Sequence, residues 1–337
     1  MPKRIRTRQP DFPPFKSAPA SALPSASIIL VTYTGAARYL EKCLESLCRL
    51  DYPQYEVIVV DNPGADDTRE VLRRCRRDEV IVLNDKNMGF AGGCNIGIAR
   101  ARHEVIVLLN FDTEAPPDWL AELVRPMTRD PRAAITGCKM YYPGGRIIQH
   151  AGGKINGNGM VEHLGFKQED AGQFDEEKDV DYVTGAGMAI RREFLAVCGG
   201  GMDEDYYPAY YEELDLCYRA HLMGYRVVFA PKSVLVHHES PVLNWQSEAF
   251  QRLHYRARML FCIKNYRLRD WLLGFIPYEI GWLRAPWSKG KRKKQIRAYL
   301  DALDYLRGRR YSPDKVFPGL ESSMNRDENP TLRNSSL

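Results

Sequence analysis

The sequence has no long apolar run. Its best candidate for a membrane span, residues 271–287, is interrupted by two prolines, a glutamate and an arginine, so we expect no helix that crosses a bilayer. Residues 1–20 contain no apolar core, and a signal peptide is therefore not expected either. Both absences favour a cytoplasmic location.

The sequence also lacks paired cysteines. Its eight cysteines are scattered, and none forms a C-x-x-C pair. This spacing argues against a structural zinc site and against a disulfide framework. Reduced, mostly buried thiols in a cytoplasmic protein are the expected state.

No strong charge of one sign is present. The 48 basic and 43 acidic residues leave a net charge of +5, which is too small to indicate a nucleic-acid partner. The basic residues gather in residues 2–8 and 289–297, whereas 160–215 is acid-rich. We expect residues 1–25 to be a disordered basic tail and residues 321–337 to be a second disordered tail.

What is present, in the first half, is an alternation of strand and helix patterns. Strands are expected at 27–32, 55–61, 80–84 and 104–110, and helices at 36–50, 67–76, 89–101 and 117–125. This order predicts an α/β fold with a mostly parallel central sheet and helices on both faces. Ligands of such sheets bind beyond the carboxyl ends of the strands.

The second half is less regular. Strands are expected at 134–142, 146–149, 225–230 and 233–236, and a glycine-rich strand or turn within 180–190. Helices are expected at 191–197 and 210–223, and a loop at 152–172. Residues 247–310 are mostly helical in pattern. We therefore expect a main domain at 26–245, made of a regular half at 26–125 and a less regular half at 126–245, followed by a helical C-terminal extension at 246–320.

Two candidate sites follow the second and third strands. Asp61 and Asn62 end the second strand, where a carboxylate can bind a base or ribose, and an Asx turn is an equal alternative. Residues 87–97 contain four glycines, which allow backbone N–H groups to approach phosphate. A tight turn with close helix packing explains the same glycines.

Three further candidates carry carboxylates or imidazoles. Asn110 and Asp112 end the fourth strand and offer oxygen ligands of the kind that Mg²⁺ and Mn²⁺ bind. The segment 210–216 holds Glu212, Glu213 and Asp215; one glutamate can act as a general base, although acids at a helix start also complement its dipole. His237 and His238 point different ways on an extended chain, so at most one binds a given metal.

The order of these motifs resembles the family 2 glycosyltransferases with a GT-A fold, and within them the rhamnosyltransferase-like group. The matching segments are Val31–Thr34, Val59–Asn62, Asn87–Gly97, Leu109–Leu120, Thr184–Arg192, Glu212–Arg219 and Val236–His237. The resemblance covers about residues 27–240. It implies an inverting transfer of a sugar from a nucleoside-diphosphate donor, commonly dTDP-rhamnose in this group. The acceptor would be a glycan or lipid-linked hydroxyl in polysaccharide or glycolipid synthesis.

The resemblance also implies roles for individual residues. The donor site would comprise Thr32, Tyr33, Asp61, Asn87, Gly89, Phe90, Gly93, Asn95 and Asn110. The acceptor region would comprise Trp119, Thr184, Gly185 and Asp215. Asp112 and His237 would hold a divalent metal, Mg²⁺ or Mn²⁺, and Glu213 would be the catalytic base.

This chain departs from the family pattern at four positions. Asn110 replaces an aspartate and leaves one charged metal ligand. Thr34 and Cys94 replace asparagines and can alter donor contacts. Glu213 replaces an aspartate and reaches one methylene further, so the choice of base between Glu212 and Glu213 stays open.

Two alternative functions are a nucleotidyltransferase and a non-enzymatic scaffold. A nucleotidyltransferase needs a basic, glycine-rich loop after the first strand, but residues 33–38 hold one glycine and one basic residue. A non-enzymatic scaffold would bind nucleic acid or membrane through basic and aromatic residues at 250–310. Residues 265–297 combine apolar and aromatic side chains with a basic cluster, which suits peripheral contact with the cytoplasmic face of an anionic membrane. A helical layer buried against the domain is the alternative.

Overall fold

A computed structural model describes residues 23–64, 66–75, 79–239, 248–284 and 292–308. The expected disordered tails lie outside these residues, apart from residues 23–25. Three parts of the expected extension, 246–247, 285–291 and 309–320, lie outside them as well. The division into a main domain and an extension stays a prediction.

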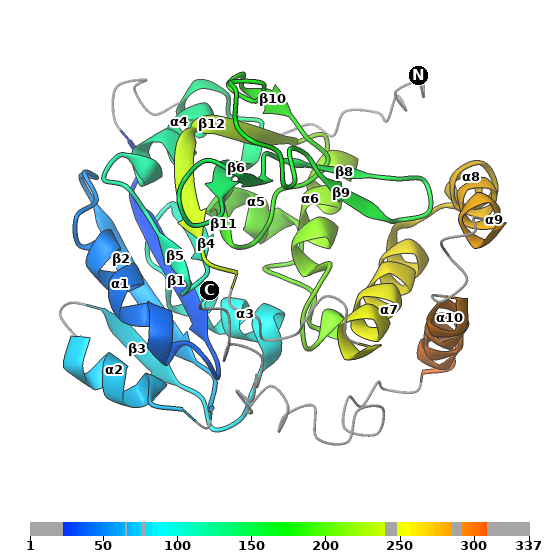
Figure 1. Ribbon diagram of the computed structural model, residues 1–337, viewed down its shortest axis with the longest axis horizontal. Helices are drawn as coiled ribbons and strands as arrows, with labels where there is room; N and C mark the ends of the chain where they lie inside the picture. The colour runs from blue at the N-terminus through cyan, green and yellow to red at the C-terminus, as the bar shows by residue number, and fades with distance from the viewer. Residues whose placement is uncertain (1–22, 65, 76–78, 240–247, 285–291, 309–337) are drawn as a thin grey trace, which may run out of the picture.

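Ten strands of the described residues form one sheet, whose main path runs β10-β12-β6-β11-β4-β1-β2-β3 (Figure 1). The strands on this path are β1 (Ala26–Thr32), β2 (Tyr55–Asp61), β3 (Val80–Leu83), β4 (Val105–Leu109), β6 (Ala133–Tyr141), β10 (Lys178–Asp179), β11 (Gly187–Arg191) and β12 (Arg226–His237). Short β5 (Thr113–Glu114) pairs with β12, and β7 (Ile148–His150) pairs with β6. Strands β1 to β4 pair in parallel, as do β6 and β12, whereas β11 is antiparallel to both β4 and β6. The expected mostly parallel α/β architecture is confirmed.

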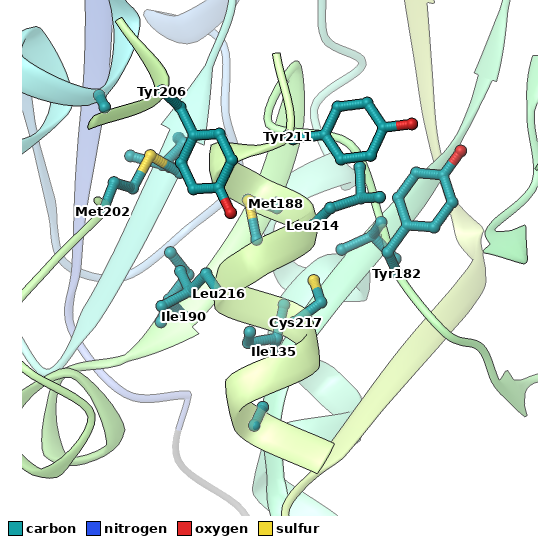
Figure 2. Packing of buried hydrophobic residues seen from close by; sticks show 14 of the residues in the cluster. Ile135, Tyr182, Met188, Ile190, Met202, Tyr206, Tyr211, Leu214, Leu216 and Cys217 are labelled. Carbon is teal, nitrogen blue, oxygen red and sulfur yellow. The ribbon is translucent and has the colours of Figure 1, made fainter. Parts of the chain in front are cut away.

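Helices cover both faces of this sheet. They are α1 (Ala37–Leu47), α2 (Thr68–Cys75), α3 (Gly89–Arg100), α4 (Trp119–Arg129), α5 (Arg192–Val197), the short η1 (Glu204–Tyr206) and α6 (Glu212–Leu222). Alternate side chains of β1 enter two separate cores, because successive strand residues point to opposite faces. Ile28 and Leu30 pack with residues of α1 and α4, whereas Ile29 and Val31 pack with residues of α3 and α6. Figure 2 shows the second core around α6.

The structure differs from expectation in two places. Residues 152–172 were expected to be a loop, but they contain a hairpin of β8 (Gly153–Ile155) and β9 (Val161–His163). Each of its strands has only three residues, which is too short to show a periodic pattern. The two strands expected at 225–230 and 233–236 are one strand, β12. Its register shifts between Ala230 and Val234, around Pro231, which cannot donate a ladder hydrogen bond.

The C-terminal helices form a layer beside the sheet domain. They are α7 (Glu248–Asn265), α8 (Leu268–Asp270), the π-helical η2 (Trp271–Phe275), α9 (Ile276–Arg284) and α10 (Arg292–Leu306). Figure 1 shows them at the end of the molecule opposite α1 and α2. None of the described helices is long and apolar enough to cross a membrane.

Candidate active site

A pocket opens at the carboxyl ends of β1, β2 and β4, between the N-termini of α3 and α6. It is lined by Tyr33, Thr34, Asn62, Asn87, Gly89, Phe90, Asn110, Thr184, Gly185, Ala186, Pro208, Ala209, Tyr210, Glu212 and Glu213. Nine of these residues were expected at the site from the sequence. The pocket lies at the sheet edge where parallel α/β folds bind ligands.

The N-terminus of α3 is fixed to the end of β2 by Asn62. The Asn62 amide donates to the backbone oxygen of Gly89, and its Oδ1 accepts from the backbone N–H of Met88 at 3.1 Å. Gly89 has a φ of +69°, and a Cβ on it would lie 2.7 Å from the backbone oxygen of Pro208. Only glycine fits this turn, because an L side chain would meet both backbone strain and a steric clash. The turn holds the α3 N-terminus against the pocket, where the positive end of the helix dipole favours anions.

Asp112 and His237 meet at the same edge of the sheet. Asp112 follows β4, and β5 pairs with β12 so that Thr113 lies opposite His237. The Asp112 Oδ1 atom is 3.2 Å from His237 Nε2, and the Asn110 amide nitrogen is 3.3 Å from the same Nε2. His237 Nδ1 lies 2.6 Å from Gln149 Oε1, so an N–H on Nδ1 donates a hydrogen bond to that oxygen and the Nε2 lone pair faces Asp112.

The arrangement of Asp112 and His237 fits a divalent cation. Two ligands about 2.1 Å from one octahedral ion lie about 3 Å apart, close to the observed separation. The outer contact of His237 with Gln149 is of the type that orients a ligating imidazole. The described residues contain no group of three or more His, Cys, Asp or Glu side chains that could hold a metal. A cation here would therefore take its remaining ligands from amide oxygens, water or a bound diphosphate, as Mg²⁺ commonly does.

Glu212 and Glu213 begin α6 and both line the pocket. Glu212 is 2% exposed, and its Oε2 has no hydrogen-bond partner among the described residues. Burial raises the pKa of the Glu213 carboxyl to about 7. Burial and the neighbouring Glu213 carboxylate raise the pKa of Glu212 well above its usual range. Both carboxyls therefore hold a proton to higher pH than an exposed glutamate does.

The turn before these carboxyls is strained and is supported from outside the sheet domain. Tyr210 and Tyr211 have φ values of +83° and +76°, in the left-handed region that non-glycine residues rarely occupy. The Tyr211 hydroxyl donates to the backbone oxygen of Gly159 at 2.8 Å. From α7, His254 packs against the Tyr211 ring and Phe250 packs against the Tyr210 ring. The C-terminal layer thus holds the turn that aims both glutamates into the pocket.

Thr184 and Gly185 lie beside these carboxyls, as expected for an acceptor region. The backbone oxygen of Ala186 accepts from the N–H of Asn110 at 3.2 Å, which ties the segment to the end of β4. A Cβ on Gly185 would lie 3.0 Å from Phe90 Cε1 and 3.8 Å from Glu213 Cβ. Gly185 therefore allows Phe90 and Glu213 to share one wall.

Two residues expected in the acceptor region lie in the core instead. Trp119 is fully buried at the start of α4, in the hydrophobic cluster on the α1 side of the sheet. Its backbone oxygen accepts from Ser233 of β12, so the residue joins α4 to the sheet. Asp215 is 3% exposed and accepts hydrogen bonds from Tyr206, Asn265 and Arg219. It faces away from the pocket because it lies on the side of α6 that packs against those residues.

Gly93 and Asn95, expected to bind the donor, hold α3 in place. A Cβ on Gly93 would lie 2.6 Å from Val31 Cγ1, so glycine lets α3 pack directly on β1. The Asn95 amide nitrogen donates to the backbone oxygen of Met202 and to Glu204 Oε1, both at 2.9 Å. Neither residue lines the pocket. These two positions correct the expected donor site.

Thr32 and Asp61, also expected to bind the donor, lie behind the pocket wall. The Thr32 hydroxyl donates to Asp61 Oδ1 at 2.7 Å, and Arg69 Nε donates to Asp61 Oδ2 at 2.8 Å. Asp61 is 2% exposed, and the wall in front of it is formed by Asn62. Both carboxylate oxygens of Asp61 thus bond within the protein.

The pocket has a wall that the sequence analysis did not assign. Pro208, Ala209 and Tyr210 line it, and the backbone oxygen of Pro208 accepts from the N–H of Phe90 at 2.9 Å. The signal in the sequence was the position of Tyr210 directly before the two glutamates. No pattern indicated that this loop faces the start of α3.

The family model and several similar proteins point to the same family. The model of "Glycosyl transferase family 2" matches residues 27–199. The uncharacterized protein y4gI of Sinorhizobium fredii is 32% identical over 75% of this chain, and the match covers 28% of y4gI. The N-acetylglucosaminyl-diphospho-decaprenol L-rhamnosyltransferase of Mycobacterium tuberculosis is 23% identical over 87% of this chain and 97% of its own length. The chain spans only 18% of the O-antigen biosynthesis protein RfbC of Myxococcus xanthus, to which it is 29% identical over 66% of its own residues.

Solved structures share the fold. GalNAc-T7 with UDP, GalNAc and Mn²⁺ superposes with a TM-score of 0.61 at 15% identity, over 83% of this chain and 55% of that one. The mannosyltransferase PcManGT of Pyrobaculum calidifontis, in complex with GDP-Man and Mn²⁺, gives a TM-score of 0.55 at 20% identity, over 93% of this chain and 88% of that one. Both are GT-A proteins, and the expected GT-A fold is confirmed.

Proposed function

Because the chain belongs to glycosyl transferase family 2, we propose that it transfers a sugar from a nucleoside-diphosphate donor to an acceptor hydroxyl. One observation carries the proposal. Glu212, Glu213 and residues at the start of α3 line one pocket, and Asn110 in its wall contacts His237, which lies beside Asp112. A base and an anion site thus face one cavity, as displacement of a diphosphate requires.

Glu213 is the proposed base. Its ionised carboxylate accepts the proton of the acceptor hydroxyl while that oxygen bonds to the anomeric carbon. The bond from the anomeric carbon to the diphosphate oxygen breaks on the opposite side, so the configuration inverts. A pKa of about 7 suits this role, because a base is most effective when its pKa lies near the working pH.

Glu212 has a different proposed role. Burial and the neighbouring Glu213 raise its pKa and favour its protonated form, which can donate a hydrogen bond. Glu212 lines the pocket, where its carboxyl can bond to a sugar hydroxyl. This assignment separates the two glutamates that sequence alone left equivalent.

The diphosphate is proposed to lie between the α3 N-terminus and Asp112. The positive end of the α3 dipole would favour its negative charge. Asp112 and His237 would hold Mg²⁺ or Mn²⁺, and the cation would supply positive charge to the departing diphosphate. Two of the similar structures contain Mn²⁺, which supports a divalent ion.

The donor is proposed to be a nucleoside-diphosphate hexose, with dTDP-rhamnose as the first choice, in the synthesis of a polysaccharide or glycolipid. The M. tuberculosis relative is named as a rhamnosyltransferase that acts on a diphospho-decaprenol, which supports this choice and a glycan or lipid-linked acceptor. The similar structures were solved with UDP and GDP-Man, so those nucleotides belong in the same test.

The test is a panel of nucleotide-sugars, each with Mn²⁺, with Mg²⁺ and with a chelator, read by thermal unfolding. A true donor at 100 times its Kd stabilises the fold by about 2.7 kcal/mol. We expect one donor to raise the Tm only when a divalent ion is present. If no nucleotide-sugar raises the Tm under any of these conditions, the proposed function is wrong.

A further inference from the structure

The C-terminal layer exposes an unusual number of large apolar side chains. Fifteen such side chains are exposed among the described residues, and ten of them lie between residues 268 and 306. Those on α8, η2 and α9 are Leu268, Leu272, Leu273, Ile276, Tyr278 and Ile280. Leu268, Leu272, Ile276 and Ile280 follow one another at intervals of four, so they form a stripe along one side of the segment. We call these six side chains the C-terminal apolar surface.

The segment that carries this surface is apolar on two sides, and only one side is covered. Trp271 packs against Tyr266 of the α7 end, and Trp282 packs against Tyr255 of α7. The leucine and isoleucine stripe points elsewhere: Leu268 is 73% exposed and Leu272 is 53% exposed. A helix that is apolar all round is normally covered on every side, by protein or by lipid. The expected helical layer, buried against the domain, is therefore found only on the aromatic side of the segment, which α7 covers.

Basic residues accompany the surface along the chain. Arg269 and Arg284 lie within α8 and α9, and α10 begins with Arg292, Lys293 and Lys294. The first turn of α10 contains no acidic residue. Cations at a helix N-terminus are unfavourable, because the helix dipole places partial positive charge there. An anionic partner would relieve that cost.

The surface is firmly joined to α7, to α10 and, through Asn158, to the β8–β9 hairpin. Arg258 of α7 donates to both carboxylate oxygens of Glu279 in α9, at 2.7 and 2.9 Å, and this ion pair is buried. Asn158 and Tyr299 of α10 donate to the same carboxylate. Because a buried pair is costly to break, the apolar surface keeps a fixed orientation relative to the pocket.

We propose that the C-terminal apolar surface docks onto an anionic lipid bilayer, with its leucines and isoleucines among the acyl chains and the adjacent basic residues against the headgroups. An apolar stripe flanked by Lys and Arg is the pattern of helices that lie in the membrane interface. A second copy of the chain is a poorer partner, because two copies would bring like-charged clusters together. The proposal concerns binding alone and does not depend on the proposed transfer reaction.

The experiment is flotation of the full chain with vesicles of phosphatidylcholine alone or of phosphatidylcholine and phosphatidylglycerol in equal parts, without any nucleotide-sugar. We expect the chain to float with the anionic vesicles only, and less so at high salt. The double variant Leu268→Glu, Leu272→Glu should stay at the bottom of the gradient. Leu83→Glu is the matched control, because Leu83 is a similarly exposed leucine on β3 and should float like the wild type.

A second variant tests the charge. Neutralising both lysines, in Lys293→Gln with Lys294→Gln, should lower the partition coefficient onto anionic vesicles by about fivefold for each lysine. The proposal is overturned if the wild type does not float, if Leu268→Glu, Leu272→Glu floats equally, or if the apolar surface instead supports a stable dimer in sedimentation without lipid. Far-UV circular dichroism of each variant verifies that the fold is intact.

Discussion

Replacing Glu213 with glutamine separates its chemistry from its packing. Glu213→Gln keeps the side chain's size and its place at the start of α6, but removes the group that accepts a proton. A positioned base contributes about 10²- to 10⁴-fold to a rate. We expect turnover to fall by that factor while the donor's Kd stays within about twofold of the wild-type value, because the donor's diphosphate is proposed to lie on the α3 side of the pocket.

The pH dependence follows from the pKa of Glu213. The wild-type kcat/KM should rise about tenfold per pH unit up to about 7 and then level off, because the base acts only when ionised. In Glu213→Gln this rise should disappear. A variant that lost activity through misfolding would instead keep a wild-type profile at a lower height.

The same pKa makes a prediction about stability. The Glu213 pKa is raised from 4.5 in the unfolded chain to about 7 in the fold, so the folded chain holds the proton longer. Its contribution to stability is therefore lost as pH rises from about 4.5 to about 7, and the full loss is about 3 kcal/mol. Glu213→Gln should lack this loss. The stability of the variant minus that of the wild type should therefore be larger at about pH 8 than at about pH 5.

The assays are initial rates of nucleotide release across pH, and urea unfolding at the two pH values. Glu193→Gln is the control, because Glu193 is an exposed glutamate in the first turn of α5 and should change neither measurement. An unchanged turnover in Glu213→Gln would refute the assignment of the base. A rate loss of the expected size in Glu212→Gln alone would transfer the role to its neighbour.

Three further substitutions test the rest of the site. Asp112→Asn should weaken donor binding at least about tenfold in Mn²⁺ but hardly at all in a chelator, measured by isothermal titration calorimetry, and His237→Ala should have the same effect. Equal losses of affinity with and without the metal would contradict a metal role. Gly89→Ala should weaken donor binding and lower stability by about 1–3 kcal/mol, because its φ is +69°, whereas Gly281→Ala, with open space around it, should do neither. Trp119→Ala should cost about 3–5 kcal/mol in urea unfolding yet leave the KM for the acceptor unchanged, and a rise in that KM without a loss of stability would return Trp119 to the acceptor region.

The first half of the fold was easier to predict from the sequence than the second, and the reason is physical. Strands such as β1 and β4 are buried on both faces, so their apolar runs are visible in the sequence. The β8–β9 hairpin has no such signal. Its strands are fixed by distant contacts, such as the Tyr182 ring, whose Cε1 atom would lie 2.0 Å from a Cβ on Gly153. Glycine there lets the hairpin lie flat on that tyrosine, and no local pattern encodes this.

The sequence predicted which segments form the site, but not which of their residues face the pocket. The glycine-rich segment 87–97 contributes Asn87, Gly89 and Phe90 to the pocket, while Gly93 lets the same helix pack against β1. A motif combines pocket residues and packing residues because both are needed to place one helix end at one sheet edge. Sequence spacing shows that the segment matters, but burial in the folded chain decides which residues face a ligand.

The least predictable part of the site is the dependence of its carboxyls on the C-terminal layer. Tyr210 and Tyr211 occupy a strained backbone region, and strain of about 1–3 kcal/mol per residue persists only where surrounding contacts enforce it. Those contacts come from His254 and Phe250, about forty residues later in the chain. Without α7, the turn would relax and Glu213 would lose the burial that raises its pKa. We therefore conclude that the helices after the sheet domain belong to the machinery of the pocket, although residues 27–199 alone match the family model.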